Sequence, residues 1–224
     1  MLNFNGPQHK AIFHEHFMMW VFLCFAFNGF ALVTAQSVNH QYQLPIDTEE
    51  IKKVIVILDS YIDLEINTSS KSSIEIDETR GGEYYNARTL QTEFKGNKIF
   101  ITDPVLPAYT IPNDKLAAHK VMDSKVELRI PEGLDLVIEC QNASIKIEGS
   151  YSNLSINQQG GTCNLSRISS DIKFESISAV VHYRLSQHRI EIQDRNSKRV
   201  INNGSSSKIH TSRLESISGT IQPL

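Results

Sequence analysis

A short apolar–polar–apolar unit returns every nine residues between Leu136 and Ile201. Eight units follow in register, and apolar or aromatic residues occupy fifteen of their sixteen flanking positions, with Arg199 as the exception. These flanking positions are Leu136, Ile138, Ile145, Ile147, Leu154, Ile156, Cys163, Leu165, Ile172, Phe174, Val181, Tyr183, Ile190, Ile192, Arg199 and Ile201. Alternate side chains of a strand point to opposite faces, so each unit predicts a short strand with two inward side chains.

A strand that returns every nine residues predicts a coil in which two units form an eighteen-residue rung. Leu136 would then stack near Leu154, Ile172 and Ile190, and no single rung could bury its apolar residues alone. We therefore expect an all-β protein, a parallel β-solenoid with nine-residue half-rungs. Hexapeptide repeats do not fit, because steps of six from Leu136 reach polar residues. Calcium-binding nonapeptide repeats need recurring Gly and Asp in the turns, which this chain lacks.

An apolar run over residues 17–35 ends on the small residue Ala35. The run predicts a secretory signal peptide, residues 1–35, cleaved before Gln36. An uncleaved membrane anchor is the alternative, because the run is almost long enough to span a bilayer. Asn28 and Gly29 interrupt the run and favour the cleaved signal. We therefore expect an exported protein, in the periplasm, at the outer membrane surface or outside the cell.

The remaining chain divides into a polar leader and one domain. Residues 36–52 predict an exposed leader, and residues 53–224 predict a single β-solenoid domain whose first strand begins at Lys53. Its N-terminal part is less regular and includes a hairpin turn around Gly96. Residues 103–125 contain three prolines and predict a loop insertion. Residues 126–201 contain the most regular coil.

Composition narrows the class of partner and the redox chemistry. The chain has 224 residues and a formal net charge of −3, with no basic stripe, so nucleic acid is not an expected partner. Two cysteines, Cys140 and Cys163, follow the predicted signal. They fall on different faces of the repeat, which favours two buried thiols over a disulfide and leaves pairing as the alternative.

The stretch KVELRIPEGLDLVIECQNASIKIEGSYSNLSINQQGG and the earlier stretch IDLEINTSSKSSIEID resemble a family of exported bacterial β-solenoid proteins. That family carries the label "putative auto-transporter adhesin head domain", a domain of unknown function. The resemblance covers roughly residues 53–220 and implies a right-handed, mostly parallel solenoid, a handedness that crossover preference also favours. It implies export to the cell envelope, and it carries over no functional residue. The adhesin label itself rests on fold analogy.

Four outward positions of the repeat form the candidate binding stripe: Glu139, Asn157, Glu175 and Gln193. Rungs lie about 4.8 Å apart, so Glu139 and Glu175 would be separated by about 10 Å. That separation is too large for one shared metal ion or for a retaining glycosidase pair. A solvated face without a ligand is the alternative interpretation.

The sequence contains no clustered Cys or His at zinc-ligand spacing, no nucleophile elbow and no phosphate loop. We therefore expect no cofactor, no metal and no catalytic residue. The predicted function is that of a non-enzymatic cell-envelope protein that binds a surface glycan or another envelope protein. The alternatives are a scaffold that self-associates through its terminal rungs and a carbohydrate-active enzyme assembled across rungs.

Overall fold

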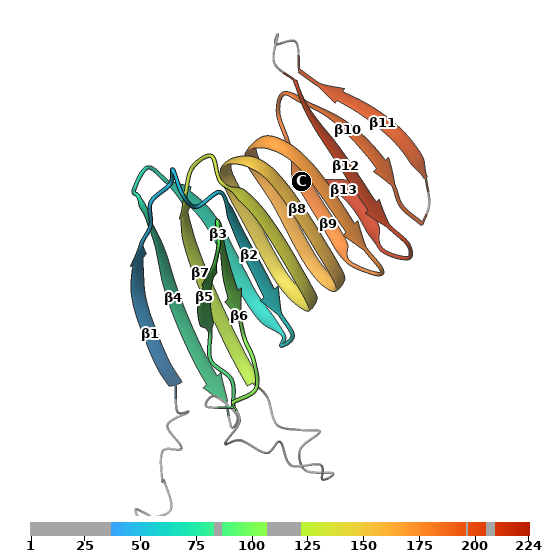
Figure 1. Ribbon diagram of the computed structural model, residues 1–224. Coiled ribbons are helices and arrows are strands. Elements are labelled where there is room, and N and C mark those ends of the chain that lie inside the picture. Colours follow the sequence, from blue (N-terminus) through green and yellow to red (C-terminus); the bar gives the residue numbers. More distant parts are fainter. Residues whose placement is uncertain (1–36, 83–86, 107–121, 196, 205–208) are drawn as a thin grey trace, which may run out of the picture. The chain divides into compact units, whose positions relative to one another are not determined.

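The computed structural model describes residues 37–82, 87–106, 122–195, 197–204 and 209–224 (Figure 1). The predicted signal peptide, residues 1–35, and most of the predicted loop 103–125 lie outside the described residues. Strands and their connections make up the described part, which confirms the predicted all-β class. No helix in these ranges has the length and hydropathy that a membrane span requires.

Thirteen strands of the described residues belong to one sheet. They are β1 (Ser37–Pro45), β2 (Lys53–Leu58), β3 (Ile62–Ser69), β4 (Ser73–Gly82), β5 (Gln91–Lys95), β6 (Lys98–Thr102), β7 (Met122–Pro131), β8 (Asp135–Ser176), β9 (Val180–Arg184), β10 (His188–Gln193), β11 (Lys198–Asn203), β12 (His210–Ser216) and β13 (Thr220–Pro223). The predicted hairpin around Gly96 is confirmed, because β5 and β6 pair antiparallel up to Lys95 and Lys98.

The predicted right-handed parallel β-solenoid is wrong, because the sheet is mixed and curled. Among the described strands, β1–β4, β4–β7, β5–β6 and β10–β11 pair antiparallel, whereas the other pairs are parallel. An apolar–polar–apolar strand after a short turn looks the same in sequence whether the chain turns a corner or reverses. At the turn between β10 and β11 the Asp194 carboxylate accepts the Ser197 backbone N–H at 2.8 Å, and the chain reverses.

The eighteen-residue spacing appears in the register of the central strands but fails beyond them. Cys163 of β8 lies beside Val181 of β9, in parallel strands, as the spacing requires. Ile190, in contrast, does not lie beside Ile172. Strand β12 runs between β8 and β10, so that Ser212 pairs with Ile172 on one side and with Ile190 on the other. A segment distant in sequence therefore occupies the position that the repeat assigned to β10.

A buried histidine ties these three strands together. His188 of β10 is fully buried, and its Nδ1 lies 2.7 Å from the Ser212 Oγ of β12. Its Nε2 lies 2.9 Å from the carbonyl oxygen of Ile168 in β8. One ring nitrogen donates to the carbonyl and the other accepts from the hydroxyl, so the neutral imidazole satisfies both contacts. Burial lowers the pKa of His188 below its ordinary value.

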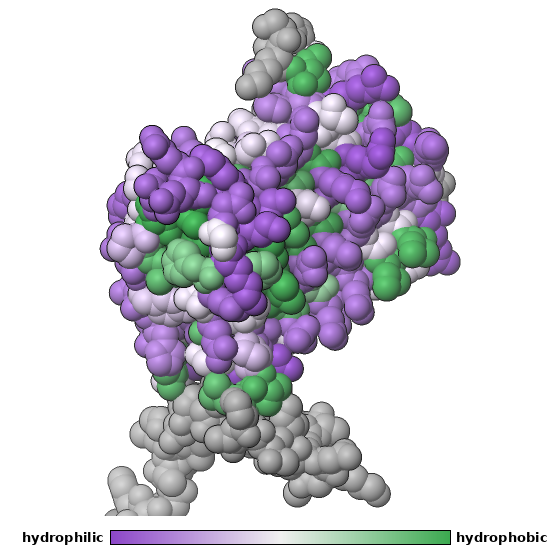
Figure 2. All heavy atoms as spheres, in the orientation of Figure 1, coloured by the Kyte–Doolittle hydropathy of each residue, from purple (hydrophilic) through white to green (hydrophobic). Residues whose placement is uncertain are grey.

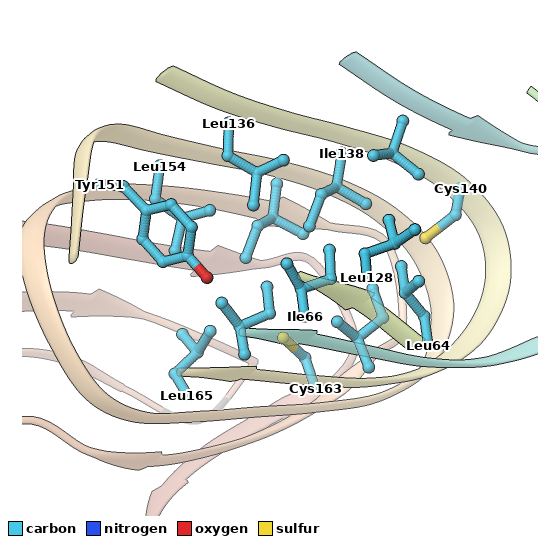
Figure 3. Packing of buried hydrophobic residues seen from close by; sticks show 14 of the residues in the cluster. Leu64, Ile66, Leu128, Leu136, Ile138, Cys140, Tyr151, Leu154, Cys163 and Leu165 are labelled. Carbon is cyan, nitrogen blue, oxygen red and sulfur yellow. The ribbon is translucent and has the colours of Figure 1, made fainter. Parts of the chain in front are cut away.

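The concave side of the curled sheet encloses one hydrophobic core. Figure 3 shows Leu136, Leu154 and Leu165 pointing into the space that the strands surround. Inward positions of almost every strand contribute, and most of these side chains are less than 5% exposed. Cys140 and Cys163 are both free and buried in this core, so the prediction of two separate thiols is confirmed.

The first strand lies earlier than the sequence predicts. Residues 37–45, within the segment expected to be an exposed leader, form β1 and pair with β4 from Ser37–Gly81 to Pro45–Ser73. Polar residues dominate β1, which is why its pattern resembles a leader. Its side chains are exposed or half-buried, and Tyr42 and Leu44 pack against the core.

Neighbouring turns of β8 approach so closely that one position requires glycine. Gly161 has a φ of +98°, and a Cβ added there would lie 2.2 Å from the carbonyl oxygen of Ala143. Gly133 also has a positive φ, +78°, but a Cβ there would meet no atom within 4 Å. A side chain at Gly133 would therefore add backbone strain alone, whereas a side chain at Gly161 would add strain and a steric clash.

We expect Gly161→Ala to lower the free energy of unfolding by more than about 3 kcal/mol, since strain and displacement of the strand add. Gly133→Ala is the matched control and should cost about 1–2 kcal/mol from strain alone. Urea unfolding followed by circular dichroism measures both. Equal costs would contradict the close approach of the two β8 segments.

We also expect the free energy of unfolding to fall as pH drops from 7.5 to 5. The lowered pKa of folded His188 means that the unfolded chain binds a proton first, so acid favours unfolding. His188→Gln should reduce this pH dependence, whereas His182→Gln, at a half-buried outward position, should retain it. Urea midpoints at several pH values test this, and identical slopes for wild type and His188→Gln would refute it.

Candidate functional site

An outward row of polar side chains crosses the strands on one face of the sheet. The polar row consists of Glu139, Asn157, Glu175, Glu215 and Gln193. Four of its members are the stripe predicted from sequence. The fifth, Glu215, lies in β12 and is paired in register with Glu175 on one side and with Gln193 on the other. Sequence reasoning missed Glu215 because the nine-residue period does not reveal where β12 inserts.

Most of this hydrogen-bonding capacity is unused within the chain. Glu139, Asn157 and Gln193 are exposed, and Glu175 and Glu215 are half-buried. Only Glu175 has a partner, the Lys173 ammonium at 2.9 Å. Within the described residues the other four side chains make no hydrogen bond or ion pair. The row therefore presents free carboxylate and amide groups at strand spacing, about 4.8 Å from one strand to the next.

Three shallow hollows border the polar row, and the one lined by Gln193, Val200 and Glu215 has a volume of about 280 Å³. Two others lie along the row. The first has a volume of about 220 Å³ and is lined by Ile57, Leu58, Asp59, Glu139, Cys140, Gln141, Asn157 and Gln159. The second, of about 260 Å³, is lined by Glu175, Ser176, Gln193, Glu215, Ser216 and Ile217. Sites that enclose a small molecule usually measure about 300–1,000 Å³. Hollows of this size suit single side chains or sugar units of a larger partner.

Two exposed isoleucines stand at the turns beside the second hollow. Ile177 is 51% exposed and Ile217 is 77% exposed. The Ile217 N–H donates to the Ser176 carbonyl at 3.1 Å, and the Ser218 N–H donates to the Ile177 carbonyl at 2.7 Å. These bonds hold the two turns side by side, and we name the pair the aliphatic corner. Figure 2 shows a largely hydrophilic surface on which hydrophobic residues form separate groups.

A second outward face carries charges that are already paired with one another. Lys146 of β8 lies 2.9 Å from Glu65 of β3, and this hydrogen bond lowers the pKa of Glu65. Arg129 of β7 lies 3.3 Å from Asp77 and 3.5 Å from Glu75, both in β4. These pairs join neighbouring strands and leave less capacity for a ligand than the polar row has.

Several buried polar groups have structural roles. The Asp103 carboxylate accepts the backbone N–H groups of Asp59 and Ser60 at 2.7 and 3.1 Å, which closes the turn between β2 and β3. Glu78 and Arg80 form a buried ion pair on the inward face of β4. A buried pair of this kind is costly to break, because removal of one partner leaves an uncompensated charge.

The described residues offer little for catalysis. They contain no group of three or more His, Cys, Asp or Glu side chains able to hold a metal ion. Burial raises the pKa of the Cys140 thiol to about 12 and that of Cys163 well above its ordinary value. Both sulfurs therefore stay protonated at neutral pH, and neither is an activated nucleophile.

Comparison with protein-family models gives no match, and comparison with curated proteins gives none either. Several solved structures are similar over most of their length. A "putative cell adhesion protein" from Clostridium sporogenes is 11% identical, with a TM-score of 0.48 over 83% of this chain and 99% of that chain. A "putative adhesin" from Bacteroides fragilis is 11% identical, with a TM-score of 0.34 over 84% and 97%.

A third solved structure is described as a "putative lipid binding protein" from Parabacteroides distasonis. It is 14% identical, with a TM-score of 0.25 over 83% of this chain and 96% of that chain. Likeness at these identities and TM-scores assigns no function to this chain.

Proposed function

We propose that this chain is a non-enzymatic protein, exported to the cell envelope, that binds an envelope protein through the polar row and the aliphatic corner. The observation that carries the proposal is the unused hydrogen-bonding capacity of Glu139, Asn157, Glu215 and Gln193 on neighbouring strands. The strands hold the backbone at these positions in place, so no loop has to become ordered on binding and only the side chains lose rotamer freedom. Export rests on the predicted signal peptide, residues 1–35.

A protein partner fits this surface better than a glycan. Protein interfaces combine an apolar centre with a polar rim, and Ile177 and Ile217 beside Glu215 and Gln193 supply both parts. None of the residues that line the two hollows is aromatic. Ligand sites usually include aromatic side chains among their apolar lining, and a sugar ring would find no such surface here.

Binding of the labelled, purified protein to intact cells of the producing organism distinguishes the two partner classes. We expect protease treatment of the cells to abolish binding and periodate oxidation of their glycans to leave it intact. The reverse result would assign a glycan partner and overturn the protein assignment. An absence of binding to both intact and opened cells would overturn the proposed function itself.

The double variant Glu215→Lys with Ile217→Ser should weaken binding at least tenfold, because it removes the free carboxylate and the most exposed apolar anchor. The introduced lysine would lie beside Glu175, so the fold should tolerate the change. Ile209→Ser removes another exposed aliphatic side chain, 47% exposed and directly before β12 at the end remote from Glu215, and should retain full binding. Equal affinity of the two variants would show that the polar row is not the binding surface.

A further inference from the structure

Within the described part of the chain, the first strand of the sheet has a strand partner on one side only. In the sheet order β1 comes first, and it pairs only with β4 among the described strands. Half of its backbone N–H and C=O groups therefore point away from the sheet, along nine residues or about 30 Å. Such an edge is a template on which another strand can add.

The other edges of the sheet carry features that discourage strand addition. Strand β5 has five residues and includes Glu93 and Lys95, and β11 has six residues and includes Lys198 and Arg199. Strand β13 has only four residues and ends in proline. Charged side chains, proline and short length are the usual means by which edges avoid pairing. These three edges are therefore protected.

Strand β1 is longer than these three strands and lacks their charged side chains. Its sequence, SVNHQYQLP, contains no Lys, Arg, Asp or Glu, and its single proline is the last residue. Its register with β4 runs through nine consecutive residue pairs without a bulge. The strand is thus long, straight in register and uncharged, and two copies of it would not repel each other.

The sequence of β1 is also complementary to itself when two copies run antiparallel about Gln41. In that register Val38 faces the second copy's Leu44, and the exposed His40 faces the second copy's Tyr42, on the same face of the strand. On the outward face Asn39 meets Gln43, and Gln41 meets itself. Val38 therefore meets an aliphatic residue, His40 meets an aromatic residue and amides meet amides, while Ser37 lies opposite Pro45 at each end.

We propose that β1 is a homodimerisation edge, at which two copies of this chain join antiparallel into one continuous sheet across a twofold axis. The occupant is a second copy because the strand is uncharged and matches itself from Val38 to Leu44. Dimerisation would depend on β1 and not on the polar row. A monomeric protein could therefore still bind its partner, and a dimer could lack partner binding.

Sedimentation equilibrium of the purified full chain should give the mass of a dimer. The double variant Asn39→Lys with Gln43→Lys places four lysines opposite one another across the axis and should give a monomer. Within one copy, residue 43 lies beside Glu75, so the variant should keep its thermal midpoint. Ser152→Lys with Ser169→Lys adds the same charge at exposed positions of β8 and should remain a dimer.

Disulfide formation tests the register. In a Cys24→Ser background, Gln41→Cys should cross-link two copies on oxidation, since residue 41 meets itself at the axis. Asn39→Cys should not, because residue 39 meets residue 43. A wild-type monomer at all concentrations, a dimer that survives the two lysines in β1, or equal cross-linking of the two cysteine variants would each overturn the proposal. Capture of a foreign strand by monomeric protein would assign the edge to another partner instead.

Discussion

Burial of alternate apolar side chains on the concave side of one curled sheet is the constraint on which the structure depends. Each short straight stretch of strand supplies only two or three inward residues, such as Leu154 and Ile156 within β8. Burial of one such side chain contributes about 1.5–3 kcal/mol, so no strand can offset its own loss of conformational entropy. Stability therefore belongs to the sheet as a whole. The strands must therefore lie close together. At Gly161 they are so close that any side chain would collide with the carbonyl oxygen of Ala143.

Which side chains are buried could be predicted from the sequence, because alternation reports burial directly. Leu136, Ile156 and Phe174 are buried as the nine-residue pattern requires. Strand direction could not be predicted, because parallel and antiparallel strands have the same two-residue period. The position of β12 was equally hidden, since its pairing with β8 joins residues about 40 apart, Ser212 and Ile172. The contacts of His188 with Ile168 and Ser212 fix that position, and a single histidine gives no such signal in a sequence.

The same alternation explains why the candidate site is a row. Once Phe174 and Leu214 point inward, Glu175 and Glu215 must point outward, and pairing of the strands brings them side by side. Adjacent like charges are unfavourable, and Lys173 offsets only one of the two carboxylates. On the second outward face, neighbouring carboxylates are offset by ion pairs, such as that of Arg129 with Asp77. Four of the five side chains of the polar row, in contrast, remain without a partner among the described residues, and this free hydrogen-bonding capacity supports the proposed binding role. The sequence placed four of the five residues of the polar row on one outward face. It missed Glu215, because β12 pairs between β8 and β10, out of sequence order.

The polar row and the β1 edge lie on different strands, and the two proposed functions are compatible for that reason. The row crosses β8, β12 and β10, whereas β1 is joined to the sheet through β4 at the other end of the strand order. Pairing of two copies at β1 would leave the polar row of each copy uncovered and would hold the two polar rows in one rigid body. Two linked sites bind a surface with many copies of a partner far more tightly than one, often by a factor of about 10²–10⁴. A shallow row with hollows of about 220 and 260 Å³ would bury little of any single partner, and modest affinity for one copy is the expected result. Dimerisation at the uncharged β1 edge would therefore present two polar rows together and convert a weak contact into stable attachment.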